Sequence, residues 1–93
     1  MNNIYVHPYV FKRHPDIKQE SIVHAFLSYE IMRQRMDVDN EEYVGFGFDV
    51  AGRAIEFVAT RNEDGDWLIF HANTPLSNSI KKELGLERKK NER

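Results

Sequence analysis

The chain contains no cysteine, and this absence removes several kinds of chemistry at once. Without a thiol there can be no disulfide, no thiolate nucleophile and no cysteine-ligated zinc or iron–sulfur centre. The four histidines do not share a helix at i,i+4 spacing, and they show no other recognised spacing of metal ligands. We therefore expect no metal site.

Long apolar runs and nucleotide-binding glycine patterns are also missing. No stretch approaches the about 18 consecutive apolar residues of a membrane-spanning helix, and no charged-then-apolar leader opens the chain. The glycines of Gly45-Phe46-Gly47 are followed by neither a third glycine nor a helix, which phosphate-binding motifs require. The sequence predicts a cytoplasmic protein with no membrane contact and no nucleotide cofactor.

What remains is the composition of an ordinary globular protein, with 41% hydrophobic and 30% charged residues. We expect one domain over residues 1–86 and a charged, disordered tail over residues 87–93. Charge is uneven along the chain, because residues 37–66 carry nine acidic and two basic side chains while both flanking segments are net basic. Such polarity is compatible with one side facing RNA and another facing a protein, and also with hairpin tips that are simply solvated.

The central stretch, residues 43–73, predicts three antiparallel strands separated by two turns, because apolar residues alternate along it. The first strand has an expected core face of Val44, Phe46, Phe48 and Val50. A two-residue turn at Ala51-Gly52 would set Phe46 opposite Phe57 and bring the apolar sets to one side. An even-length second turn adds Leu68, Phe70 and Ala72 to this side, and leaves Trp67, Ile69 and His71 on the other.

On that other side, His71 is expected opposite Glu56, and Glu56 lies across from Gly47. Glycine within a strand often marks a place where a ligand or another backbone comes close, so the pair indicates a site. The same pattern also fits a strand histidine that hydrogen-bonds a neighbour, with glycines that relieve twist.

Apolar spacing and capping signals predict the remaining elements. They are a short strand over 4–6, a helical turn over 8–13, a helix over 17–27 capped by Asp16, a strand over 28–36, and a helix that starts with Thr74-Pro75 and ends at Gly85. Residues 28–36 could instead continue the helix before them, and we favour the strand. The expected fold is α+β, with a mostly antiparallel sheet of four or five strands packed on one side by the two longer helices.

Three fragments resemble a known family. They are Arg13-His14-Pro15-Asp16-Ile17 before an apolar helix, Gly52-Arg53-Ala54-Ile55-Glu56, and Leu68-Ile69-Phe70-His71-Ala72-Asn73-Thr74 before a lysine-bearing helix. In this order they are similar to the BrnT-like toxins, small bacterial proteins with a RelE-type fold. The resemblance implies a metal-independent ribonuclease toxin of a type II toxin–antitoxin pair, held inactive by a cognate antitoxin protein.

The family's basic residue and histidine before the helix fall on Arg13 and His14, and its last-strand signature falls on residues 69–72. The family often has arginine directly after that signature, where this chain has Asn73. The last helix carries Lys81 and Lys82 rather than a dense run of arginines.

RNA cleavage requires a base for the 2′-hydroxyl, an acid for the departing 5′-oxygen and cations for the phosphate. Either Glu56 or His14 is the expected base and His71 the expected acid, while the substrate-binding candidates are Arg13, Arg53, Arg61 and Lys81. His14 could equally be a loop histidine that bonds a backbone carbonyl. Arg53 and Arg61 could instead cover the sheet edge with their stems.

The sheet side away from the expected helices is predicted to be open, and it would attract a partner. Its exposed patch consists of Tyr43, Val58, Trp67 and Ile69. The expected occupant is the antitoxin or a second copy of the chain. A catalytically silent interaction module of the same fold is the competing hypothesis, and the sequence leaves open whether an RNA target is ribosome-associated.

Overall fold

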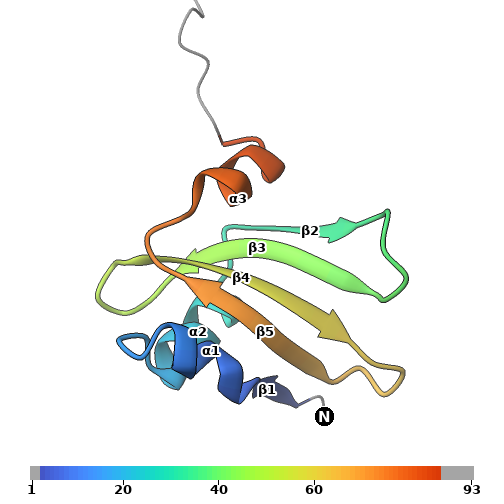
Figure 1. Ribbon diagram of the computed structural model, residues 1–93, viewed down its shortest axis with the longest axis horizontal. Helices are drawn as coiled ribbons and strands as arrows, with labels where there is room; N and C mark the ends of the chain where they lie inside the picture. Colours follow the sequence, from blue (N-terminus) through green and yellow to red (C-terminus); the bar gives the residue numbers. More distant parts are fainter. Residues whose placement is uncertain (1–2, 87–93) are drawn as a thin grey trace, which may run out of the picture.

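A computed structural model describes residues 3–86, so the predicted disordered tail at 87–93 lies outside the described residues. Five strands form one sheet in the order β1-β5-β4-β3-β2, and three helices flank it (Figure 1). The elements are β1 (Ile4–Val6), α1 (Pro8–Arg13), α2 (Gln19–Leu27), β2 (Ile31–Arg35), β3 (Glu42–Phe48), β4 (Ala54–Arg61), β5 (Trp67–Asn73) and α3 (Asn78–Glu83). β1 pairs in parallel with β5, and the other three pairings are antiparallel. The predicted α+β fold is confirmed.

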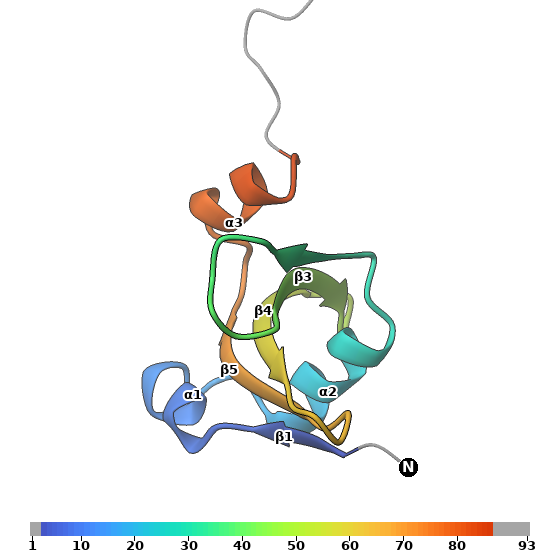
Figure 2. The same cartoon turned by 90° about the vertical axis from the view of Figure 1, so that its right-hand side faces the viewer.

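The sheet is strongly curved and wraps around α2 (Figure 2). The main core lies between them, where Ile22, Ala25 and Phe26 of α2 pack on Phe57 and its strand neighbours. The ring of Phe26 meets the ring of Phe57 edge-on, with 5.1 Å between the centroids. Within residues 3–86, no helix has the length and apolar character needed to cross a bilayer.

The C-terminal helix α3 packs on the opposite side of the sheet from α2. Its buried Ile80, followed by Leu84, contacts Val44 and Val58 in a second, smaller apolar cluster. Phe46 and Phe70 are partly buried against the same cluster. The expectation that both longer helices share one side was wrong, and the reason lies in the pairing of β3 with β4.

β3 and β4 pair one residue away from the predicted register, with Phe46 opposite Glu56 rather than Phe57. The turn is one residue longer than predicted, because Asp49 already pairs with Arg53: its amide donates to the Arg53 carbonyl at 3.0 Å. The Asp49 carboxylate also accepts from the Arg53 amide at 2.8 Å and from the Arg53 Nε at 2.9 Å. A one-residue slip exchanges the two faces of a strand, so Val44 and Phe46 face α3 instead of α2.

The strand glycines therefore face the main core and not a ligand. A Cβ atom at Gly47 would overlap the backbone of Ala25 in α2. One at Gly45 would overlap the carbonyl of Ile31 in the neighbouring strand. The close approach that these glycines indicated is real, but the approaching backbone belongs to the protein itself.

Local signals predicted all three helices and misplaced the starts of two of them. α1 spans the residues predicted for it, and β2 forms and pairs with β3 as expected. α2 begins at Gln19 rather than at residue 17, with Lys18 and not Asp16 at the N-cap. α3 begins after Ser77, whose side chain accepts from the Ile80 amide, and Gly85 follows its end with a φ of 75°.

Candidate functional site

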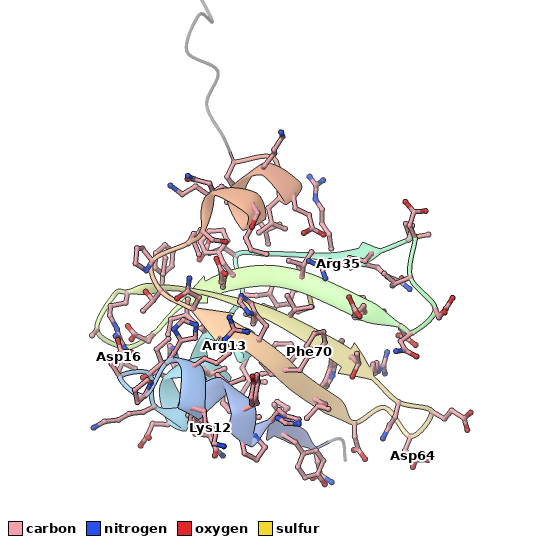
Figure 3. The ribbon with its side chains drawn as sticks, viewed as in Figure 1. Lys12, Arg13, Asp16, Arg35, Asp64 and Phe70 are labelled. Carbon is pink, nitrogen blue, oxygen red and sulfur yellow. The ribbon has the colours of Figure 1, made fainter. Side chains whose placement is uncertain are left out.

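An open groove of about 510 Å³ lies on the α3 side of the sheet, and we call it the α1–α3 groove. The side chains that line it come from the end of α1, the strands β2, β4 and β5, and the start of α3. In Figure 3 the labelled Arg13, Arg35 and Phe70 lie between α3 and α1, at this groove. All three predicted catalytic candidates line it, namely His14, Glu56 and His71.

Glu56 and His71 meet as predicted, although not as directly opposed residues. The His71 Nε2 atom lies 2.7 Å from the Glu56 Oε2 atom. In the ladder, Glu56 pairs with Asn73 and Val58 pairs with His71, so the contact runs diagonally between β4 and β5. The pair faces α3 on the same side as Phe46, whereas the sequence placed it on the other side.

Glu56 is buried, with 1% of its surface exposed, and donors occupy both of its oxygens. Besides His71, the Ser77 amide donates to Oε1 at 2.6 Å and the Ser77 hydroxyl donates to Oε2 at 3.2 Å. Burial alone would raise the pKa of the Glu56 carboxyl, but the hydrogen bonds from His71 and Ser77 together lower the pKa below its ordinary value. Glu56 is therefore ionised at neutral pH.

An ionised carboxylate only accepts hydrogen bonds, so the Nε2 atom of His71 carries a proton in this pair. The other ring nitrogen, Nδ1, forms no hydrogen bond with any group within residues 3–86. The side chain of His71 is 37% exposed, which makes it accessible from the groove. Glu56 can hold the imidazole in position, and its burial prevents it from acting as the base that the sequence suggested.

Arg13 and His14 reach the groove from the end of α1. His14 is the C-cap residue of this helix, and its amide donates to the Val10 carbonyl at 2.9 Å. The guanidinium carbon of Arg13 lies 6.0 Å from the centre of the Tyr9 ring. Within the described chain, the His14 ring makes no hydrogen bond, so it is not the loop histidine bonded to a backbone carbonyl that the sequence offered as an alternative.

Arg35 also lines the groove, and the sequence reasoning missed it. Its guanidinium bonds Glu83 through Nε at 2.7 Å and Nη2 at 2.9 Å, and Glu42 through Nη1 at 2.9 Å. The hydrogen bond to Glu83 raises the pKa of Arg35, and the guanidinium lowers the pKa of the Glu83 carboxyl in return. No local signal relates Arg35 to Glu83, because 48 positions separate them.

Three predicted substrate-binding residues do not line the groove. Arg53 is bonded to Asp49 in the β3–β4 turn. Arg61 lies at the far end of β4, with its guanidinium carbon 5.5 Å from the centre of the Trp67 ring and Nη1 4.0 Å from Glu41. Lys81 is exposed on α3. The structure thus gives Arg53 and Arg61 other contacts.

The predicted partner-binding patch does not exist as one surface. Ile69 and Val58 are buried, at 0% and 4% exposure, and they belong to clusters on opposite sides of the sheet. Trp67 packs on Phe26 of α2, with ring centroids 5.1 Å apart, and Tyr43 stacks edge-on against Trp67. The prediction was wrong because α2, and not solvent, covers the face that carries Trp67 and Ile69.

Among residues 3–86, no three histidine, aspartate or glutamate side chains gather in a way that could hold a metal ion. Comparisons with protein-family models, with curated proteins and with solved structures give no match to this chain. The resemblance to the BrnT-like toxins therefore stays a prediction.

Proposed function

We propose that this protein is a metal-independent endoribonuclease that cleaves RNA in the α1–α3 groove, and that it is the toxin of a type II toxin–antitoxin pair. One observation carries the proposal: two histidines from separate elements share a groove, and a buried carboxylate fixes one of them. Arg13 supplies a cation beside them. These are the groups that RNA cleavage needs when no metal takes part.

The geometry suggests a division of labour that differs from the one predicted. His71 lines the groove, and in the proposed step its Nδ1 takes the proton of the 2′-hydroxyl, while the Glu56 carboxylate stabilises the imidazolium that forms. The 2′-oxygen then attacks the phosphorus, and the bond from phosphorus to the 5′-oxygen breaks. Protonated His14 donates its proton to the leaving 5′-oxygen, and Arg13 balances the phosphate charge. The products are a 2′,3′-cyclic phosphate and a 5′-hydroxyl end.

A catalytically silent interaction module remains the second candidate, and the charges of the groove favour it. The guanidinium of Arg35 is shared between Glu42 and Glu83, so most of its charge is already balanced. Asn73 lines the groove where the resembled family often has arginine. An RNA-binding groove with few available cations would bind its phosphate weakly.

Cleavage of a single-stranded RNA in the presence of a chelator separates the two candidates. We expect the wild-type protein to produce 2′,3′-cyclic ends, and His71→Ala or His14→Ala to lose about 10²- to 10⁴-fold in rate. His24→Ala is the matched control, since His24 lies on α2, bonds the Phe48 carbonyl and does not line the groove. Intact RNA after prolonged incubation with folded wild-type protein would favour the silent module.

The toxin role has its own test. Induced expression in bacteria should arrest growth, and His71→Ala should relieve the arrest. Co-expression of the product of a short neighbouring gene, the expected antitoxin, should restore growth with the wild-type toxin. A protein that cleaves RNA in vitro but never slows growth would be a ribonuclease of another kind.

A further inference from the structure

A bulge in β5 brings an aromatic ring next to His71. The pairing with β4 shifts between Val58 and Ala59, which face His71 and Ile69, so Phe70 is an extra residue. Ile69 and Ala72 both belong to the main core, and Phe70 and His71 between them both line the α1–α3 groove. In a regular strand two successive side chains point to opposite faces, so the bulge is what places ring and imidazole together.

Phe70 does more than fill the core. One part of its side chain packs against the cluster of Val58 and Ile80, but the residue is only half-buried and its remaining surface borders the groove. The other apolar residues that line the groove, Val58 and Ile80, are buried at 4% and 5% exposure. Phe70 is therefore the aromatic surface that a ligand in the groove would meet.

Arg13 lies at the same groove and marks where a phosphate would sit. Its side chain is exposed and comes from α1 on the side of Phe70 (Figure 3). It lines the groove together with Phe70 and His71. An apolar ring, a cation and an imidazole in one groove match the three parts of a nucleotide chain: the base, the phosphate and the reactive hydroxyl. Aromatic rings stack with unpaired bases, and arginine neutralises the neighbouring phosphate.

We propose that Phe70 is a stacking platform for one base of the substrate, next to the phosphate that is cleaved, and that the substrate is single-stranded RNA. This inference rests on the proposed ribonuclease function and adds the substrate class. A base within a duplex is stacked and paired on both sides, so it cannot lie on Phe70 unless it leaves the helix. Duplex RNA should accordingly bind more weakly than the same strand alone.

An abasic scan with an uncleavable ligand tests the platform. A short 2′-O-methyl oligonucleotide cannot be cleaved, because the attacking hydroxyl is blocked, and its binding is measured by fluorescence anisotropy. Loss of one base at the position that meets Phe70 should weaken binding to wild-type protein by about 5- to 150-fold. Phe70→Leu should bind the complete oligonucleotide more weakly than the wild type does, by a similar factor. Its affinity should no longer change when that base is lost.

Two further variants keep the test independent of folding. Phe70→Trp retains an aromatic face and should retain the response to the abasic position. Phe46→Leu removes a ring from the same apolar cluster, but Phe46 does not line the groove, so its binding should equal that of wild type. An abasic response that is the same in Phe70→Leu and wild type overturns the platform.

Parallel incubation with the ribose form of the oligonucleotide separates this inference from the proposed function. Cleavage by wild-type protein with an unchanged abasic response in Phe70→Leu would overturn the platform and leave the ribonuclease standing. Phe70-dependent binding without any cleavage would support the platform and overturn the ribonuclease. Failure of every oligonucleotide to bind would overturn both.

Discussion

Replacing Glu56 by glutamine perturbs the buried centre of the site without changing its size. Glutamine has one acceptor oxygen and one donor nitrogen where glutamate has two acceptor oxygens. Its oxygen can therefore accept from only one of the two neighbours, His71 or the Ser77 amide, and its nitrogen faces the other. In the wild type both neighbours donate an N–H to the Glu56 carboxylate, His71 from Nε2 at 2.7 Å and Ser77 from its amide at 2.6 Å. Both hydrogen bonds lose their charge assistance, and the contact with His71 survives only if the imidazole changes tautomer so that Nε2 accepts from the glutamine amide.

The loss in free energy of unfolding should be about 1.5–3 kcal/mol at pH 7, the usual worth of a hydrogen bond to a charged group. For a domain of this size, such a loss lowers the melting temperature by about 6–24 °C. Urea unfolding of the wild type and of Glu56→Gln measures it. Glu41→Gln is the control, because Glu41 is 42% exposed in its ion pair and should lose less than about 1 kcal/mol.

The pH dependence of this difference has a defined sign. The pKa of Glu56 is lower in the folded protein than its ordinary value of 4.5, so the carboxylate stabilises the fold above about pH 4.5. As the pH falls below that value, through the lowered pKa of the folded state, the wild type should lose this stability and the difference from Glu56→Gln should shrink. A difference that stays below about 1 kcal/mol at pH 7, or that does not change with pH, would refute the account of Glu56 as a buried, ionised anchor.

Three other experiments test separate parts of the structure. Gly47→Ala should lower the free energy of unfolding by about 3 kcal/mol or more, because the new Cβ meets the α2 backbone. Gly52→Ala is the control: its Cβ would lie in open space but its φ is 87°, so the free energy of unfolding should fall by only about 1–2 kcal/mol in the same urea titration. Ser77→Ala should lower the unfolding free energy by about 1–2 kcal/mol through loss of a helix cap and of a bond to Glu56, and an unchanged stability would contradict both contacts. Arg35→Met should release Glu83 and speed amide exchange in α3, while β1, which Arg35 does not contact, should exchange as in the wild type. Hydrogen-exchange measurements would show this, and an α3 that exchanges equally fast in variant and wild type would mean that the ion pair does not hold the helix.

Short-range signals in the sequence were sufficient for the parts of the fold that depend on neighbouring residues. The helical turn before His14 and the stop at Gly85 follow from proline and glycine preferences, which act within a few positions. The alternation over residues 43–73 predicted three strands, and three strands formed. The nearness of Glu56 to His71 was also predictable, since each was assigned to the correct strand.

Tertiary contacts decided which way those elements face, and with it where the site lies. One extra turn residue, closed by Asp49 and Arg53, moved Phe46 to the α3 side, and the bulge at Phe70 turned His71 to that same side. A shift of one residue costs little in local terms but inverts a strand, so alternation alone cannot choose between the two registers. The ion pair of Arg35 with Glu83 and the burial of Glu56 depend on α3 reaching the sheet from a distant part of the chain. The sequence by itself determined the elements and the chemical groups, and packing determined that they meet in one groove.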